Sequence, residues 1–363
     1  MTPSAGSLSR VVRFPRLRAL AWSGDHLYAS RGYDLLRAKI LPGQVPSNSL
    51  QWEPVASFHP QLRRRLSVTN RLTARLFRDG FHALAPVATG GFVAAVPGAI
   101  ITLRPNETEF HATHTITRGT RPLHITAVPN GPIYWGEYFD NPARDEVHIY
   151  ASTDGEASGS DRKWSVAYTF PKGAIRHVHN IVHDPWGDCL WILTGDYGAE
   201  CRILRASCDL GRIEVVRQGN QQARAVALVP TQHGLYFSSD TPLEQNYVYL
   251  LDRAGDLTQL APITGSSIYG CRVGNHVFFS TMVEPSEANP DPYVRIFGLE
   301  SGTVPTQQTW RSQRSWKKDR WPPGLFQYGN AFLPDGNNAT EFLAVTTIAV
   351  EEDDQATSLY ALS

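Results

Sequence analysis

The chain has 363 residues, with 34 Lys and Arg balanced by 34 Asp and Glu, so its formal net charge is zero. This balance excludes a nucleic-acid binder driven by overall charge, and no dense basic run takes its place. A hydrophobic content of 42% with 29 Gly, 25 Pro and only 2 Met indicates a folded chain with many turns and few long helices.

A strand–turn–strand pattern appears first in residues 17–40, LRALAWSGDHLYASRGYDLLRAKI, around Ser23-Gly24-Asp25. Two apolar runs rich in Val, Ile, Phe and Tyr, joined by a glycine-containing turn, are typical of a β-hairpin. The pattern recurs six times along the chain, around Thr89-Gly90-Gly91, Asn130-Gly131, Trp186-Gly187-Asp188, Gln232-His233-Gly234, Gly274-Asn275 and Asp335-Gly336.

Seven such units predict one all-β domain over residues 1–363, a seven-bladed β-propeller, with six blades as the alternative. Several hairpins are followed by two further strand-like segments, as a four-stranded blade requires. Val11-Val12 could supply the missing strand of the last blade. Residues 59–80 are a basic insertion or surface helix between the first two blades, and could cover a blade or face a ligand. Blade cores are expected near residues 17–58, 81–118, 121–170, 176–218, 222–263, 267–311 and 326–363.

No apolar stretch is long enough to span a bilayer, and the first residues lack the apolar core of a signal peptide. We therefore expect a cytoplasmic protein, or a periplasmic or secreted one if the sequence is trimmed. The cysteines form no CxxC pair, which argues against a zinc ribbon and favours free thiols over a single disulfide.

In a propeller, the start of each innermost strand and the end of each second strand meet at one face, where loops can carry a site. Here these positions are polar and titratable. The alternative is that these polar side chains have no function beyond forming hydrogen bonds with one another and with ordered water. As catalytic candidates we name His124, His177, His179, Glu137, Asp196, Asp240 and Tyr328, and as substrate-binding candidates Arg121, Arg176, Arg224, Trp135, Tyr269 and Glu284.

Arg176-His177-Val178-His179 is the densest group. Strand alternation predicts that the two histidines point the same way and that Arg176 points the other way. Such a pair could act as a general acid or base, or bind a metal with His124 or His82 as third ligand. The spacing specifies no third ligand, so we predict no definite cofactor and leave a structural or catalytic divalent metal as an alternative.

Arginines and aromatic side chains occur together at the blade entrances. A guanidinium binds a carboxylate through two hydrogen bonds, and aromatic rings stack on sugars. GxGxxG, P-loop and GxSxG motifs are all missing, which weakens dinucleotide, phosphate-transfer and serine-hydrolase functions. The expected partner is an anionic oligo- or polysaccharide, with no nucleic acid and no membrane span.

Two segments resemble the Asp-box of sialidase-like propellers: Ser152-Thr153-Asp154-Gly155 with a later Lys163-Trp164, and Ser207-Cys208-Asp209-Leu210-Gly211. In that family the box is a folding feature on the face away from the site. Three further segments resemble sialidase landmarks, namely Val12-Arg13-Phe14-Pro15, Ala29-Ser30-Arg31 with Asp34, and Gln327-Tyr328-Gly329. The tyrosine has no clear glutamate partner and the third arginine is not identified, with Arg224 and Arg272 as alternatives, so the resemblance does not extend to a claim of sialidase activity.

The sequence therefore favours a carbohydrate-active enzyme that cleaves a glycosidic bond in a uronate-containing glycan. In a lyase, an arginine or a cation would neutralise the uronate carboxylate, and a His or Tyr would remove the C5 proton. In a hydrolase, two carboxylates would flank the bond, and the candidates are Glu137, Asp196, Asp240 and Glu284. The competing hypothesis is a non-catalytic propeller that binds a glycan or a protein partner.

Overall fold

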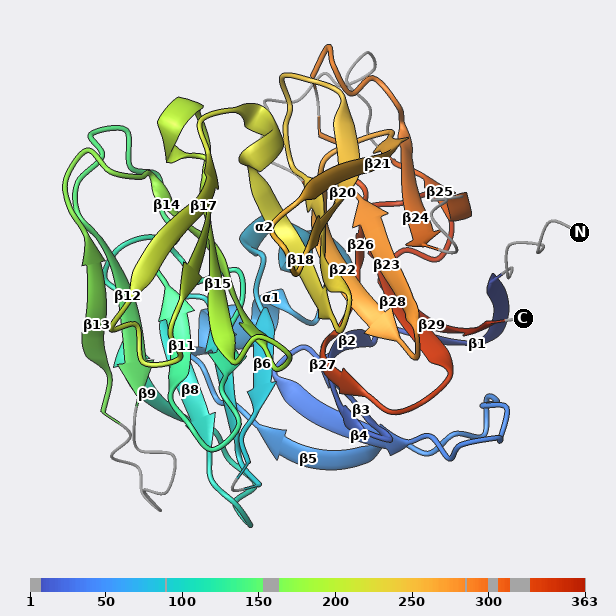
Figure 1. Ribbon diagram of the computed structural model, residues 1–363. Helices are drawn as coiled ribbons and strands as arrows, with labels where there is room; N and C mark the ends of the chain where they lie inside the picture. Colours follow the sequence, from blue (N-terminus) through green and yellow to red (C-terminus); the bar gives the residue numbers. More distant parts are fainter. Residues whose placement is uncertain are drawn as a thin grey trace, which may run out of the picture.

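A computed structural model describes residues 8–88, 90–152, 163–284, 286–299, 306–313 and 327–362. Its strands form seven sheets, antiparallel except for one parallel pair in the first, that follow one another in chain order around a central channel (Figure 1). The fold is a seven-bladed β-propeller, which confirms the prediction. Six of the sheets have four strands and the seventh has five.

The first four blades contain consecutive strands of the chain. Their strands are, in the first blade, β2 (Arg18–Gly24), β3 (His26–Arg31), β4 (Asp34–Lys39) and β5 (Glu53–Ser57); in the second, β6 (Ala83–Pro86), β7 (Phe92–Val96), β8 (Ala99–Leu103) and β9 (His111–Thr115); in the third, β10 (Thr126–Ala127), β11 (Ile133–Gly136), β12 (Val147–Ser152) and β13 (Ser165–Phe170); and in the fourth, β14 (His177–Asp184), β15 (Cys189–Gly195), β16 (Arg202–Ala206) and β17 (Ile213–Gln218).

The last three blades continue this order until the seventh, which takes its outer strand from the N-terminus. Their strands are β18 (Ala225–Thr231), β19 (Gly234–Ser239), β20 (Asn246–Asp252) and β21 (Leu257–Ile263); β22 (Ser267–Val273), β23 (His276–Thr281), β24 (Tyr293–Leu299) and β25 (Thr306–Arg311); and β26 (Asn330–Phe332), β28 (Phe342–Ile348), β29 (Ala356–Leu362) and β1 (Leu8–Pro15).

Strand β1 closes the ring by pairing antiparallel with β29, so that Leu8 and Leu362, the first and last described residues, are paired in the seventh blade (Figure 1). The buried side chains of Val12 and Phe14 pack with Leu359 and Phe342 in a core shared with the first blade. The prediction that Val11-Val12 completes the last blade is confirmed. Closure thus depends on apolar burial as well as on backbone pairing.

A fifth strand, β27 (Asp335–Asn338), pairs in parallel with β2 on the channel side of the first blade. It also contacts β6 and β22, so it lies inside the channel. Gly336 has a φ of 92°, and a Cβ there would lie 2.2 Å from the backbone oxygen of Trp22, so only glycine fits. The prediction of a hairpin turn at Asp335-Gly336 is wrong, because this segment leaves its blade and fills the channel.

Two short helices, α1 (Leu62–Ser67) and α2 (Arg71–Phe77), lie between the first and second blades. Asp79, which follows α2, accepts hydrogen bonds from Arg64 at 2.7 Å and from Tyr33 at 3.2 Å, and this ties the helices to the first blade. Within the described ranges, no helix has the length and apolar character needed to cross a membrane. The four cysteines are free thiols.

Candidate functional site

A pocket of about 1210 Å³ opens at the face where innermost strands begin and second strands end. This is the face on which the sequence placed the candidate residues. Ten of those candidates line the pocket: Arg121, Arg176, His177, His179, Asp196, Arg224, Asp240, Tyr269, Glu284 and Tyr328.

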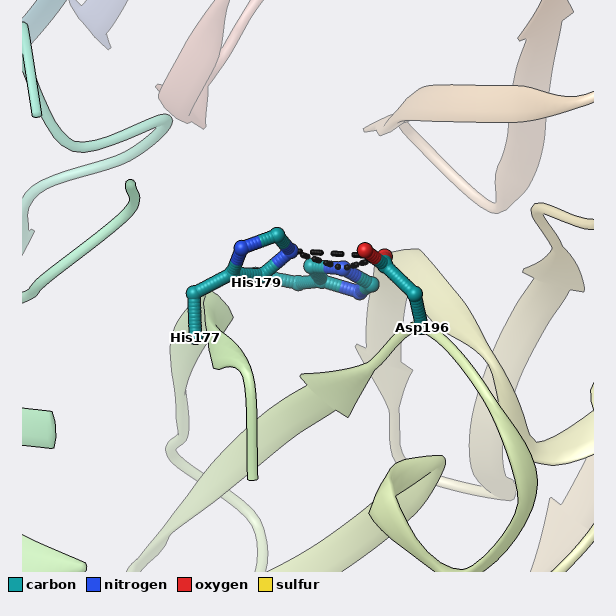
Figure 2. Close-up of side chains that lie close together, drawn as sticks. All are labelled: His177, His179 and Asp196. Atoms are coloured by element: carbon teal, nitrogen blue, oxygen red, sulfur yellow. Dashed lines mark hydrogen bonds and ion pairs between the residues drawn. The ribbon is translucent and has the colours of Figure 1, made fainter. Parts of the chain in front are cut away.

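The centre of one wall is a buried cluster of His177, His179 and Asp196, in which three side-chain atoms converge (Figure 2). The Nε2 atoms of the two histidines lie 3.1 Å apart. Asp196 Oδ1 lies 3.3 Å from Nε2 of His177 and 3.2 Å from Nε2 of His179. The three atoms therefore form a nearly equilateral triangle.

The hairpin of β14 and β15 builds this cluster. Its register shifts between Val178 and Asn180, so His179 is the extra residue of a bulge and its ring lies beside that of His177. Gly195 ends β15 opposite His177, and a Cβ at this position would lie 2.8 Å from Cε1 of His179. Glycine thus leaves the space that the imidazole occupies, and Asp196 follows at once.

The charges around Asp196 favour an ionised carboxylate. Burial alone would raise its pKa, but the close contacts of its carboxylate with His177 and His179 hold the pKa well below its usual range. Arg176 lies 3.4 Å from Oδ2, and Arg224 lies 3.6 Å from Oδ1. Burial also lowers the pKa of His179, and nearby His177 lowers it further, which favours a neutral ring.

The pKa of Asp240 is shifted in the opposite direction to that of Asp196. Its carboxyl is buried, and burial raises its pKa to about 8, with a further contribution from the charges of Glu284 and Asp196. Arg224, whose Nη2 lies 3.4 Å from Asp240 Oδ2, reverses only part of this effect. Two carboxyl groups on either side of one arginine therefore have pKa values shifted in opposite directions, as in many acid–base sites.

A group of arginines occupies another part of the pocket wall. Burial lowers the pKa of Arg121 to about 10, with the charges of Arg18 and Arg78 contributing. No carboxylate of the described residues forms an ion pair with Arg18 or Arg121. The Cζ atom of Arg18 lies 4.1 Å above the ring of Phe332, and its Nε is buried without a hydrogen-bond partner. Positive charge here lacks a counter-ion from the described chain.

His82 lies among these arginines. Burial, followed by the charges of Arg121 and Arg18, holds its pKa well below the usual value, so the ring is neutral. Its Nε2 lies within hydrogen-bond distance of the backbone oxygen of Arg78 and donates to it. Nδ1 therefore carries the lone pair. Tyr138 links the two parts of the pocket: its ring centroid lies 4.3 Å from that of His177, and the charge of Arg121 reverses part of the effect of burial, which raises the pKa of Tyr138 to about 12.

Three predicted site residues do not line the pocket. Glu137 is buried, accepts hydrogen bonds from Arg118 and from the backbone N–H of His148, and so stabilises the third blade. Trp135 stacks on Tyr150 in the core, with centroids 4.4 Å apart. His124 contacts Asp335 of β27 at 3.1 Å, inside the channel.

Arg176 lies on the same side as the histidines, contrary to the strand-alternation prediction. It precedes the first residue of β14, so the pleat does not fix its direction. Sequence reasoning also missed Arg18. This residue starts β2, and the strand-start rule applied to the first blade would have found it.

Some of the segments that resemble sialidase motifs lie at the pocket, and others lie away from it. Ser207–Gly211 forms a tight turn between β16 and β17, in which Asp209 Oδ1 accepts the Gly211 N–H at 2.9 Å. Residues 153–155 of the other Asp-box segment lie outside the described residues. Arg31, Asp34 and Tyr328 line the pocket, but Arg13 lies in the outer strand β1 and pairs with Asp353 at 2.7 Å.

No family model and no curated protein matches this chain. Solved structures match over the whole chain at low identity. The WD40 propeller domain of Doa1 has 10% identity, a TM-score of 0.57 and coverage of 100% of this chain and 98% of that one. A catalytically inactive histidine variant of virginiamycin B lyase from Staphylococcus aureus, with quinupristin, has 12% identity, a TM-score of 0.57 and coverage of 100% and 97%. A chain of the mitotic checkpoint complex has 9% identity, a TM-score of 0.56 and coverage of 100% and 96%. These similarities show the propeller fold and do not support a sialidase-like family.

Proposed function

We propose that this propeller is a lyase that binds a uronate-containing glycan in the channel-mouth pocket and cleaves it by β-elimination. The observation that carries the proposal is the pair Arg18 and Arg121. Both line the pocket, and neither pairs with a carboxylate of the described residues. In a chain of zero net charge, such local positive charge provides a specific anion site.

A uronate carboxylate would relieve the repulsion between the two guanidinium groups and accept hydrogen bonds from them. Burial lowers the pKa of both arginines. An unpaired positive charge is therefore unfavourable in this part of the pocket, and a bound carboxylate would stabilise it. Arg224, the arginine that the sequence favoured, is less available, because it already lies within ion-pair distance of Asp196 and Asp240. Aromatic faces of Tyr138 and Tyr269 line the same space.

In β-elimination, a base removes the proton on C5, its electron pair forms the C4–C5 double bond, the C4–O bond breaks, and an acid protonates the departing oxygen. His82 is neutral and could accept the proton on Nδ1. Asp240, with a pKa of about 8, is largely protonated at neutral pH and could supply a proton. Arginine on the carboxylate would stabilise the negative charge that develops.

Hydrolysis fits the pocket less well, since it needs two available carboxyl groups across the bond. Of the four candidate carboxylates, Glu137 lies outside the pocket and Asp196 is held by both histidines and by arginine, so Asp240 and Glu284 are the one pair left for hydrolysis. Virginiamycin B lyase, which has a similar fold, is catalytically inactive as a histidine variant, so a lyase that depends on a histidine has a precedent on this fold.

The test is incubation of the purified chain with uronate-containing oligosaccharides and with their neutral counterparts. We expect rising absorbance from the unsaturated uronate product, with equal appearance of new reducing ends. Reducing ends without that absorbance would mean hydrolysis instead. Absence of both, with no saccharide binding at millimolar concentration, would reject the carbohydrate function.

A non-catalytic platform is the second candidate. Helices α1 and α2 expose apolar side chains, with Leu62 70%, Leu66 59% and Phe77 40% exposed. Exposed apolar side chains close together favour docking of a protein partner. The WD40 and checkpoint-complex neighbours share only the fold, so they support this candidate no further.

A further inference from the structure

The two histidines of the pocket have their tautomers fixed by backbone carbonyls. Nδ1 of His177 lies 3.0 Å from the carbonyl oxygen of Phe139, and Nδ1 of His179 lies 3.0 Å from that of Ala225. A carbonyl oxygen only accepts, so each Nδ1 carries the hydrogen. In a neutral ring, Nε2 then carries the lone pair.

Both Nε2 lone pairs therefore face each other and Asp196 Oδ1 at distances of 3.1 to 3.3 Å (Figure 2). Three acceptors at this spacing repel one another unless something positive lies between them. Protonation of one ring would supply a single hydrogen bond and leave the other Nε2 lone pair facing an acceptor, and protonation of both rings would put two positive charges 3.1 Å apart beside Arg176 and Arg224. That arrangement is unfavourable in a buried cluster.

One metal ion removes the conflict. Ligand distances of about 2.0–2.1 Å place neighbouring donor atoms about 3.4 Å apart in a tetrahedral site and about 3.0 Å apart in an octahedral one. The observed edges of 3.1, 3.2 and 3.3 Å lie between these values. We propose that His177, His179 and Asp196 bind one divalent transition-metal ion, with its remaining coordination positions facing the pocket.

The donor set indicates which metals fit. Two imidazole nitrogens and one carboxylate suit Zn²⁺ and also Mn²⁺, Fe²⁺ and Co²⁺, whereas Ca²⁺ and Mg²⁺ prefer oxygen ligands. The carbonyls of Phe139 and Ala225 orient the rings and increase the basicity of their Nε2 atoms, as outer partners of metal-bound histidines do. Three protein ligands leave room for water or substrate, the arrangement of a catalytic rather than a closed structural site.

The neighbouring arginines also have partners of their own. Arg176 pairs with Asp140 as well as with Asp196, and Arg224 pairs with Asp240 as well as with Asp196. The carboxylate of Asp140 offsets the positive charge of Arg176 beside the proposed ion. The metal site stands on its own geometry, so it does not depend on the proposed lyase activity.

The test uses the full chain, stripped with a chelator and then titrated with Zn²⁺ and with Co²⁺. We expect one ion per chain by elemental analysis, a higher melting temperature with metal, and visible Co²⁺ absorption bands. The substitutions His177→Gln and His179→Gln should each weaken binding at least about a hundredfold. Two separate variants keep the test decisive if one of them fails to fold.

A second cluster of the described residues provides the control. His183, Asp188 and Cys208 also lie close enough together to share an ion, and they belong to the other end of the β14–β15 hairpin. The double substitution His183→Asn with Cys208→Ser should leave the stoichiometry unchanged. The proposal is overturned if the stripped chain binds neither ion at 100 µM (a level of about −5.5 kcal/mol), or if binding survives both glutamine substitutions. Loss of the ion only in the double variant would also overturn it.

Discussion

Asp184 and Arg253 join the fourth and fifth blades through two contacts, between Nη1 and Oδ2 and, at 3.1 Å, between Nη2 and Oδ1. Asp184 is fully buried at the end of β14, and Trp191 donates a further hydrogen bond to it at 3.2 Å. Burial alone would raise the pKa of Asp184, but the hydrogen bonds from Arg253 and Trp191 lower it below the usual value.

Removal of this carboxylate should destabilise the propeller without affecting the pocket. We expect Asp184→Ala to lower the free energy of unfolding by about 2–4 kcal/mol, because Arg253 loses its partner and a buried site is left empty. Urea denaturation measures the change. Asp188→Asn is the matched control, since Asp188 is exposed in the same turn. Equal stability of the two variants would mean that the ion pair contributes nothing.

Arg121→Gln should weaken binding of a uronate oligosaccharide about tenfold or more, because a carboxylate loses a charge-assisted hydrogen bond. Binding of the neutral counterpart should change little. Isothermal titration calorimetry with both sugars measures the difference. Arg205→Gln, on the outer part of the fourth blade with a side chain 48% exposed, is the control. An equal loss for both sugars would contradict an anion site at Arg121.

Arg224→Ala should behave differently from Arg121→Gln. Arg224 lies between Asp196 and Asp240, so its loss leaves two buried carboxyl groups without their shared cation. We expect a lower melting temperature in addition to weaker binding of the uronate sugar. Differential scanning fluorimetry of both variants tests this. A melting temperature for Arg224→Ala equal to that of the unaltered chain would show that Arg224 is free to bind ligand.

Asp240 makes stability depend on pH. Its pKa is raised by burial to about 8 in the folded chain, so the folded state keeps a proton that the unfolded state has released above its ordinary pKa of 3.8. The stabilisation is therefore complete below pH 3.8 and is lost as the pH rises toward 8. The free energy of unfolding should fall by at most about 1.4 kcal/mol per pH unit in this window.

Asp240→Asn removes this titration and should flatten the dependence between pH 5 and pH 8. Denaturation is measured with a chelator present, so that metal binding adds no pH dependence of its own. Asp256→Asn, at an exposed turn of the fifth blade, is the control and should retain the slope. An unchanged slope in Asp240→Asn would place the titrating group elsewhere.

Closure by β1 should be essential for stability. Val12 is 5% exposed in the core that the first and seventh blades share. Val12→Asp should cost about 3 kcal/mol or more, since it buries a charge without a partner. Ser9→Asp, exposed on the same strand, should change stability little. Thermal melting of the two variants tests whether the ring depends on its N-terminal strand.

The sequence alone predicted seven blades, with six as the alternative, because alternating apolar runs around glycine turns depend mainly on local chemistry, and only the turn at Asp335-Gly336 was placed wrongly. It also predicted the face that carries the pocket, since strand starts and second-strand ends share that face in any propeller. Through this rule it found His177, His179, Asp196 and Asp240 together. The same rule missed Arg18 only because it was not applied to the first blade.

Tertiary structure decided what no local pattern contains. Glu137 follows a second strand, as Asp196 does, yet it turns to Arg118 because that arginine comes from the preceding blade connection. His124 meets Asp335 only because β27 leaves its own blade to fill the channel. The bulge at His179, and the carbonyl of Ala225 from the next blade that fixes its tautomer, arise from packing between blades. The direction of each of these side chains depends on contacts with residues distant in sequence, and those residues come together only when the ring has closed.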